Sequence, residues 1–531
     1  MNHMIPPTYN SKEGLVLDLK NFICRCPNRV MKFNIAIESA VHDGPDDMKA
    51  EEITTLDSYL QYCEKLLRWV PNVDTTGDEL LRRILVFYWV FDQPSVLEYQ
   101  TAISPETSND DLSWLSYWLV SFARQQGIFL STPESAGLLY TFYLNSKYNQ
   151  EAELWEKPKS GWKSFNHWFS REWENINYAR PTAHPLNDNV ITMPAESTYA
   201  GNWQITNGKI KLQIKGVDYY NWPVKDLLQT EADIWNEGHF THSFLGPSDY
   251  HRQHAPVSGK VIEARVIQNQ VYLQVAKNIT TGKIYADRAI VRAPAEVKRR
   301  RGVRVQYESE GEEGEGGEDG GPRASSKKQD LDAPDDAGYQ WCQTRGLIVI
   351  QTKEYGQVAI LPIGMAQVSS VVLTVKKGDN VEKGQNISYF QFGGSDCVMV
   401  FERRVNFQAK PKEKVKVREQ VATFEDLPVN GSKWTWNEEL RPRKIRIRGC
   451  GQYDQIAHLL AKEGGALEKI SDENRIRENE WRQLTADRIP ASRSYTTSNV
   501  SRHMVRSMSM CPLYVGDSSI EEVYGNLTFH A

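Results

Sequence analysis

The stretch that decides the fold is residues 375–402, VKKGDNVEKGQNISYFQFGGSDCVMVFE. Two apolar runs rich in β-branched and aromatic residues, 387–392 and 397–401, flank the tripeptide Gly-Gly-Ser at 393–395. Such runs predict two β-strands. Glycines at the junction of two strands permit backbone conformations that other residues rarely adopt. We therefore expect the main chain itself to have a special role at this junction.

Self-cleavage is the chemistry that fits a serine beside a flexible glycine. The Ser395 hydroxyl can attack the Gly394 carbonyl, convert the amide into an ester, and lose the ester by β-elimination. The new N-terminus is then a pyruvoyl group, a carbonyl electrophile that does the work of a carbonyl cofactor. Because most Gly-Gly-Ser tripeptides are simple turns, this hypothesis depends on partner residues elsewhere in the chain.

Two histidines three residues apart are the candidate partners. His251 and His254 lie in the segment SDYHRQHAPVSGKV, residues 248–261. An imidazole within reach of the serine can act as a base. The pair could also bind a metal, but the HExxH pattern is absent and no third ligand is evident, so we expect no metal. Two purely structural histidines remain the other alternative.

The same segments resemble a known family. Residues 249–259, DYHRQHAPVSG, resemble the signature of phosphatidylserine decarboxylases, and residues 392–395, FGGS, resemble the autocleavage site of that family. Order and spacing agree, and the similarity covers roughly residues 164–428, about half of the chain. The similarity is greatest to a branch of soluble fungal amino-acid decarboxylases that includes the L-tryptophan decarboxylase of psilocybin synthesis.

The resemblance implies roles for four side chains. His254 would be the base or proton relay for the attack by Ser395. Glu196, which stands where the membrane-associated branch has an aspartate, would orient His254 and keep its imidazole in the right tautomer. In turnover, the substrate amine would form a Schiff base with the pyruvoyl group made from Ser395. His251 is then the candidate for protonating the carbanion that remains after CO2 has left.

The resemblance also implies contacts around the substrate. Arg345 resembles a family arginine and could contact a carboxylate, and Phe392 and Gly393 would line the substrate site. Residues 164–171, SFNHWFSR, resemble a further family motif, to which no catalytic role is carried over. Asp396 departs from the family, which usually has Thr or Ser after the cleaved serine. Its carboxylate could act as a second base, or could disfavour the developing oxyanion and slow cleavage.

The whole sequence predicts an α+β protein. Residues 1–150 show helical periodicity and would form an N-terminal helical domain, in which an aromatic stripe runs to a helix end at Gly127. Residues 151–428 would form a β-rich phosphatidylserine decarboxylase-like domain with paired hairpins. Its insertion at 296–337, rich in glycine and glutamate, should be disordered, and so should part of a C-terminal extension at 429–531.

Two hairpins follow from alternating apolar and polar residues after His254. The first would pair residues 260–267 with 270–275, and the second would pair residues 347–352 with 357–362.

The composition is that of an ordinary soluble protein. The 531 residues contain 63 basic and 68 acidic side chains, so the chain lacks the basic surplus expected of a nucleic-acid binder. The longest apolar run, residues 84–91, is much shorter than the ~20 residues that span a bilayer. Seven scattered cysteines form no disulfide or zinc pattern. We expect a cytoplasmic protein without a transmembrane segment or secretory signal, and the resemblance suggests a homodimer.

Three classes of function remain open. The resemblance favours a pyruvoyl-dependent carboxy-lyase whose two fragments stay associated after cleavage. Its substrate would be an aromatic amino acid such as L-tryptophan rather than phosphatidylserine, because no anchor is evident and Glu196 matches the soluble branch. Residues 255–262 and 375–385 also look like the two halves of a lipoyl or biotinyl carrier, but the lysine that a carrier modifies is missing from that setting. A relative that does not cleave and acts as a scaffold is the third class.

Overall fold

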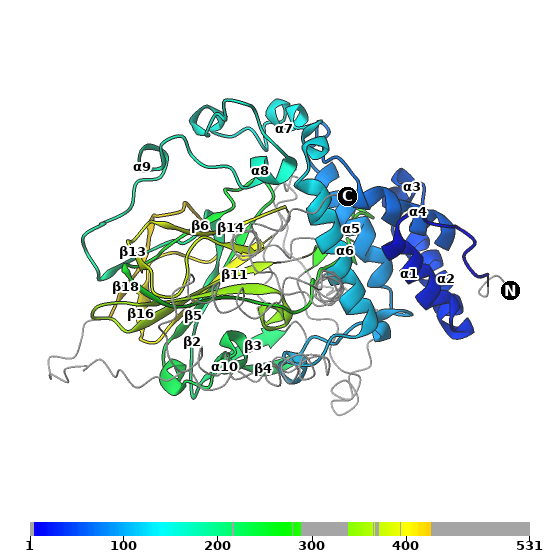
Figure 1. Cartoon of the computed structure of the whole chain (residues 1–531). Helices are drawn as coiled ribbons and strands as arrows, with labels where there is room; N and C mark the ends of the chain where they lie inside the picture. The colour runs from blue at the N-terminus through cyan, green and yellow to red at the C-terminus, as the bar shows by residue number, and fades with distance from the viewer. Residues whose placement is uncertain are drawn as a thin grey trace, which may run out of the picture. The chain divides into compact units, whose positions relative to one another are not determined.

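The computed structural model describes residues 5–214, 217–278, 280–287, 338–364, 366, 371–392 and 395–425. Residues Met1–Asp426 form one compact unit, whose elements are labelled in Figure 1. The insertion predicted at 296–337 and the C-terminal extension predicted at 429–531 lie outside the described residues.

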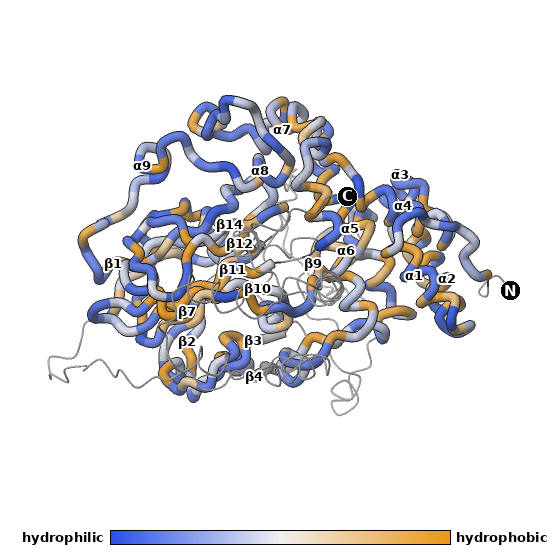
Figure 2. The backbone as a smooth tube through the Cα atoms, viewed as in Figure 1, coloured by the Kyte–Doolittle hydropathy of each residue, from blue (hydrophilic) through white to orange (hydrophobic). Residues whose placement is uncertain are grey.

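The N-terminal part of the described chain is helical, as the sequence predicts. Its centre is aromatic, because Phe87 of α5 stacks on Phe122 of α6 with ring centroids 4.5 Å apart. Hydrophobic segments recur along both helices in Figure 2. Helix α6 does not stop at Gly127 as predicted, because Gly127 keeps a helical backbone and the helix ends at Leu130. The α-helices are α1 (Gly14–Cys24), α2 (Pro27–Asp43), α3 (Pro45–Ala50), α4 (Leu56–Leu67), α5 (Glu79–Phe91), α6 (Trp114–Leu130), α7 (Tyr140–Leu144), α8 (Phe165–Phe169), α9 (Ile176–Ala179) and α10 (Val224–Leu228).

Short 3-10 helices connect several of these elements. They are η1 (Leu97–Tyr99), η2 (Pro105–Thr107), η3 (Pro133–Ala136), η4 (Ala152–Leu154), η5 (Asp233–Trp235) and η6 (Tyr339–Cys342). Within the part of the chain that the structure describes, no helix combines the length and the apolar character that a membrane span requires.

An antiparallel sheet of eight strands carries the Gly-Gly-Ser junction. The apolar run predicted as a strand at 397–401 belongs to β15 (Ser395–Phe401), which pairs on one edge with β11 (Gln357–Gly364) and on the other with β5 (His239–Leu245). The junction therefore leads directly into a central strand. The full order is β13 (Asn380–Val381), β7 (Gly259–Ile267), β10 (Arg345–Gln351), β11, β15, β5, β2 (Ser197–Gln204) and β17 (Lys414–Val415).

One of the two predicted hairpins forms and the other does not. Strands β10 and β11 cover the pair predicted at 347–352 and 357–362, and they are antiparallel neighbours. Strand β7 instead pairs with β10 and β13, while β8 (Gln274–Lys277) pairs with β9 (Ile284–Asp287). In the predicted partner of β7, the Gln343 side chain bonds to both the amide and the carbonyl of Tyr272, at 2.8 Å each, in the place where a strand partner was expected.

The helical and β-rich parts meet at the β8–β9 hairpin. Asp92, which follows α5, accepts a hydrogen bond from the Val275 amide at 2.8 Å, and Asp47 of α3 accepts one from the Ile284 amide at 3.1 Å. The remaining sheets are β1 (Val190–Thr192) with β18 (Gln420–Phe424) and β16 (Val405–Phe407); β12 (Val371–Leu373) with β14 (Asn386–Phe390) and β6 (Arg252–His254); and β3 (Lys209–Ile214) with β4 (Val217–Pro223).

Candidate active site

Ser395 begins the central strand β15. Its Cα partners are Gly364 on β11 and Leu245 on β5, so the main chain is paired on both sides from this residue onward. Gly393 and Gly394 lie outside the described residues. The described chain resumes on their other side with Phe392, which ends the segment that follows β14.

Helix α8 holds this segment in place. The Phe392 amide donates a hydrogen bond to Asn166 Oδ1 at 3.0 Å, and the Phe392 ring meets the rings of Phe165 and Phe169 edge-on at 5.2 and 5.6 Å. Ser164 caps the helix by accepting a hydrogen bond from the His167 amide. The motif SFNHWFSR, to which the resemblance assigned no catalytic role, therefore packs against Phe392, the residue that precedes the two glycines. Asn166 is a functional candidate that only this motif could have indicated.

His254 is neutral and its tautomer is fixed. Its ring is only 4% exposed on β6, and this burial lowers the pKa of His254 to about 4. Nδ1 lies 2.7 Å from the carbonyl oxygen of Gly384, which can only accept, so Nδ1 carries the proton. Nε2 is then the basic nitrogen, and the Tyr250 hydroxyl donates to it at 3.2 Å.

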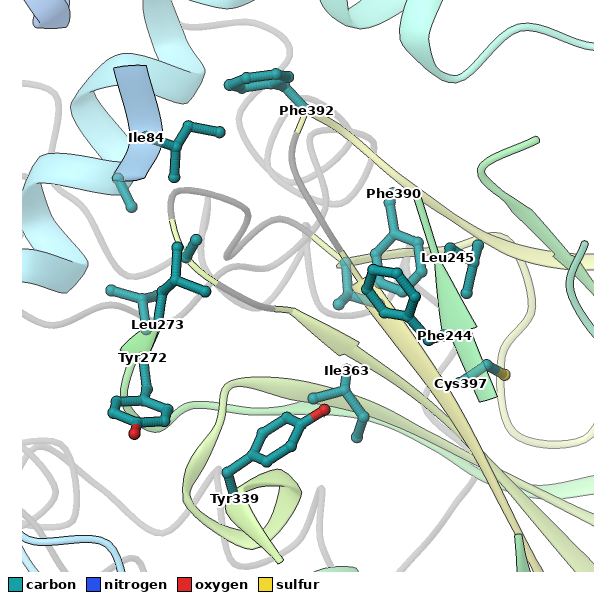
Figure 3. Close-up of a cluster of buried hydrophobic side chains, with 14 of the residues drawn as sticks. Ile84, Phe244, Leu245, Tyr272, Leu273, Tyr339, Ile363, Phe390, Phe392 and Cys397 are labelled. Carbon is teal, nitrogen blue, oxygen red and sulfur yellow. The ribbon is translucent and has the colours of Figure 1, made fainter. Parts of the chain in front are cut away.

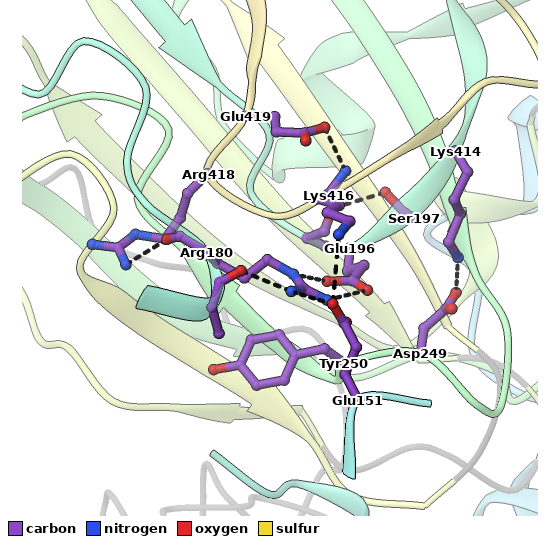
Figure 4. Close-up of polar contacts among 12 residues, drawn as sticks. Glu151, Arg180, Glu196, Ser197, Asp249, Tyr250, Lys414, Lys416, Arg418 and Glu419 are labelled. Atoms are coloured by element: carbon purple, nitrogen blue, oxygen red, sulfur yellow. Dashed lines mark hydrogen bonds and ion pairs between the residues drawn. The ribbon is translucent and has the colours of Figure 1, made fainter. Parts of the chain in front are cut away.

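Glu196 contacts a guanidinium and not an imidazole. Both of its carboxylate oxygens accept hydrogen bonds from Arg180, at 2.6 Å from Nε and 3.0 Å from Nη2, as Figure 4 shows. Arg180 also donates hydrogen bonds to Glu151. Burial opposes the charge of Arg180, but its hydrogen bonds to Glu196 and Glu151 hold the pKa of Arg180 above its usual value. The orienting contact expected from Glu196 is instead made to His254 by the carbonyl of Gly384.

His251 is fully buried, and neither of its ring nitrogens makes a hydrogen bond of ordinary geometry with a described residue, although the backbone of Asp249 and Gly246 lies near enough to oppose part of the fall in its pKa. Its ring stacks on Phe169 with centroids 3.8 Å apart, and its carbonyl accepts a hydrogen bond from the Phe390 amide at 2.9 Å. Burial, helped by the charge of Arg171, lowers the pKa of His251 well below its usual value. A buried polar group without a partner needs an explanation, and a bound substrate is one.

Arg345 has a different use from the one expected. It is completely buried, which lowers its pKa to about 9. Its guanidinium ties β10 to α10 and η6, so it is occupied by the main chain and is not available as the carboxylate contact that the sequence suggested. The carbonyls that accept its hydrogen bonds, at 2.8 to 3.1 Å, belong to Leu227, Trp341, Gln343 and Asp226.

Asp396 is also fully buried, and its carboxylate contacts Tyr339 and His242. Neither of these partners was a candidate from the sequence, because they lie 57 and 154 residues away along the chain. Among the described residues, no group of three His, Cys, Asp or Glu side chains is placed to hold a metal ion.

The family model for phosphatidylserine decarboxylase matches residues 165–423. This range contains α8, the two histidines and β15, so the β-rich part of the chain is similar to the phosphatidylserine decarboxylase family.

Three relatives illustrate the range of the match. Phosphatidylserine decarboxylase proenzyme 2 of Komagataella phaffii is 27% identical over 285 residues, which are 53% of this chain and 22% of the relative. The proenzyme of Fusobacterium nucleatum is 25% identical over 52% of this chain and 71% of the relative. The decarboxylase iboD of Amanita muscaria is 25% identical over 52% of this chain and 73% of the relative. The chain thus spans about a fifth of the Komagataella phaffii relative and over two thirds of the other two.

Proposed function

We propose that the protein is a self-processing, pyruvoyl-dependent decarboxylase, a carboxy-lyase that acts on an amino acid. The observation that carries the proposal is the fully buried His251 ring, whose two nitrogens make no hydrogen bond of ordinary geometry with a described residue. The ring packs on Phe169, and the backbone carbonyl of His251 accepts a hydrogen bond from the Phe390 amide, in the segment that leads to the Gly-Gly-Ser junction. A neutral imidazole in this position can hold or return a proton beside the bond from which the electrophile is made.

In maturation, His254 would take the proton of the Ser395 hydroxyl. Burial keeps its imidazole neutral at pH 7, and the carbonyl of Gly384 holds Nδ1–H so that Nε2 is the nitrogen that accepts. The hydroxyl of Tyr250 now donates to Nε2, so the proton reaches Nε2 either through this hydroxyl or after the Tyr250 side chain has turned away.

The bond changes of maturation are balanced within the chain and one water molecule. The Ser395 oxygen bonds to the Gly394 carbonyl carbon while the amide bond between the two residues breaks. β-Elimination then breaks the bond between Cβ and oxygen of Ser395 and leaves a carboxylate on Gly394. Water replaces the nitrogen of residue 395, and ammonia leaves.

The pyruvoyl group would supply an electrophilic carbonyl that accepts the electrons released with CO2. The residues that surround it perform the remaining tasks. His251 would return a proton to the substrate carbon. The rings of Phe165, Phe169 and Phe392, all buried, would exclude water from this proton transfer.

We propose that the two fragments stay associated after cleavage. Strand β15 would belong to the small fragment, whereas both of its neighbours, β11 and β5, would belong to the large one. All seven residues of β15, from Ser395 to Phe401, have Cα partners on both sides. A homodimer remains a prediction from the family resemblance.

The proposed substrate is an aromatic amino acid such as L-tryptophan. Support comes from Glu196, the residue that matches the soluble branch, and from an Amanita muscaria relative, similar over 73% of its length, whose name is that of a decarboxylase and mentions no phospholipid. Phosphatidylserine is the second candidate, supported by the names of the other two relatives. A non-cleaving scaffold is the third possibility.

The test is CO2 release by the purified protein from carboxyl-labelled L-tryptophan, from other aromatic amino acids, and from vesicles that contain carboxyl-labelled phosphatidylserine. Release from an aromatic amino acid alone supports the proposal. Release from the vesicles alone would show that the substrate is the phospholipid and not an amino acid. If the protein is cleaved but releases CO2 in none of the mixtures, the proposed enzyme is contradicted.

A further inference from the structure

Asp396, Tyr339 and His242 form a buried polar cluster directly after Ser395, and we call these three residues the Asp396 anchor. Their exposed fractions are 0, 1 and 1%. The Tyr339 hydroxyl donates a hydrogen bond to Asp396 Oδ2, and His242 Nε2 lies 3.2 Å from the same oxygen. The Tyr339 oxygen is also 3.5 Å from His242 Nε2, so the three groups contact one another in pairs.

Three separate segments build the anchor. Asp396 lies opposite Phe244 in the pairing of β15 with β5, and His242 lies two residues before Phe244 on the same face of β5. Tyr339 begins η6, the short helix that precedes β10. Figure 3 shows the Tyr339 ring beside Ile363, which is the Cα partner of Asp396 on β11. The anchor therefore joins β15 both to the neighbouring strand β5 and to η6.

A polar cluster at this position is expensive, and packing alone does not explain it. Three apolar side chains of similar volume would fill the same space without the cost of removing a carboxylate and an imidazole from water. Buried ionic groups of this kind are often no more stabilising than their apolar replacements. A role in the function of the site would explain why the cluster is polar.

Cleavage would leave the start of β15 as a chain end, and the anchor can hold this end in place. Once residue 395 is a pyruvoyl group it has no N–H, so the end of β15 loses a hydrogen-bond donor as well as its covalent link to Gly394. Chain ends are poorly ordered unless they are tied down. Asp396 is then the first residue of the small fragment with a complete backbone and a side chain that can be held.

We propose that the Asp396 anchor positions the pyruvoyl carbonyl after cleavage by holding the next residue in register with β5 and β11. The anchor rests on the proposed function, since it acts on a group that only self-cleavage makes. Asp396, Tyr339 and His242 are positioning residues, because they act through the main chain of residue 395. Placement of a reacting atom is worth much in catalysis, since an error of about 1 Å can lower the rate by about 10²-fold.

The first test variant is Tyr339→Phe, which removes one hydroxyl from the anchor and keeps the ring. The matched control is Tyr59→Phe, because Tyr59 is equally buried and donates its hydroxyl to the Phe87 carbonyl at 2.7 Å, within the helical part. Each full-length protein is purified, its fragments are identified by mass, and amide exchange of the N-terminal peptide of the small fragment is followed by mass spectrometry. The values of kcat and KM are measured with the substrate that the wild-type protein decarboxylates.

We expect Tyr339→Phe to be cleaved, to exchange the amides of this peptide about tenfold faster, and to lose about tenfold in kcat with KM changed less than twofold. Tyr59→Phe should change neither exchange of this peptide nor kcat. Equal effects of the two variants would show a general loss of stability and overturn the anchor. Amide exchange and kcat equal to those of the wild-type protein in Tyr339→Phe would also overturn the anchor. An uncleaved wild-type protein would overturn the anchor together with the proposed function, whereas the other two results overturn the anchor alone.

A second pair of variants decides the matter if Tyr339→Phe does not fold. Asp396→Asn keeps an oxygen that accepts the Tyr339 hydrogen bond, whereas Asp396→Ala keeps none. The anchor predicts that the Asn variant retains at least fivefold more kcat than the Ala variant, with slower amide exchange. Equal or higher kcat in Asp396→Ala would contradict it.

Discussion

The pH dependence of self-cleavage follows from the burial of His254. Only the neutral imidazole can take the proton of the Ser395 hydroxyl, so the rate should follow the neutral fraction. Burial lowers the pKa of His254 to about 4 in the folded chain, compared with about 6.5 for an exposed histidine. At pH 5 about 90% of the buried imidazole is neutral, whereas an ordinary histidine would be only about 3% neutral. Self-cleavage should therefore be nearly as fast at pH 5 as at pH 7.

The assay starts from full-length precursor made by cell-free synthesis at low temperature and transferred quickly into buffers from pH 3.5 to 8. Conversion of the 60.8 kDa chain to its fragments is followed on denaturing gels. We expect a constant rate above pH 5 and a half-maximal rate near pH 4. Circular dichroism at each pH identifies any loss of rate that comes from acid unfolding.

A half-maximal rate near pH 6.5 in a chain that is still folded would refute this reasoning, because it would mean that the proton acceptor is an exposed imidazole. A His254→Gln precursor is the control, and it should lose roughly 10² to 10⁴-fold in rate at every pH.

Three further predictions concern the residues around the site. Arg180→Ala leaves Glu196 without its partner and Glu151 with only Lys416 at 3.6 Å, and should lower the free energy of unfolding by about 3 kcal/mol in urea titrations, whereas the exposed pair broken by Arg68→Ala should cost at most about 1 kcal/mol. Asn166→Ala removes the acceptor for the amide that precedes the two glycines and should slow self-cleavage about tenfold on denaturing gels, since an unsatisfied buried amide costs about 1–3 kcal/mol. His251→Gln should still yield both fragments but should release CO2 roughly 10² to 10⁴-fold more slowly in the labelled-substrate assay. Wild-type unfolding, wild-type cleavage or wild-type CO2 release in the respective variant would contradict each expectation.

Local sequence patterns predicted much of the fold. The aromatic stripe before Gly127 predicted a helix, and the apolar run after Ser395 predicted a strand, because both depend on periodicity within a few residues. The predicted end of α6 at Gly127 was wrong. A single glycine lowers the stability of a helix by only about 1 kcal/mol, which tertiary packing can offset. The pairing of β7 was wrong because a strand is paired by whatever lies beside it in space, and here the Gln343 side chain takes the place of a strand partner for Tyr272.

The sequence predicted those site residues that belong to a recognisable motif. It did not predict the contacts that form only when distant segments come together in the fold. His251 and His254 were found through their spacing, and both are buried: His251 bonds to Phe390 through its carbonyl, and His254 lies opposite Asn386 of β14. The contacts of Glu196 could not be predicted, because Arg180 lies in a different element and competes for the carboxylate. The partners of Asp396 could not be predicted either, since they come from β5 and η6, which only the folded sheet brings together.

The central claim is that the chain cuts itself before Ser395, and the mass of the purified protein tests it most directly. The account predicts two fragments of about 45 and about 16 kDa, in proportion to residues 1–394 and 395–531, in place of one chain of 60.8 kDa. The smaller fragment should have a blocked N-terminus that reacts with carbonyl reagents. A single species of 60.8 kDa that contains Ser395 within an unbroken chain would contradict the account.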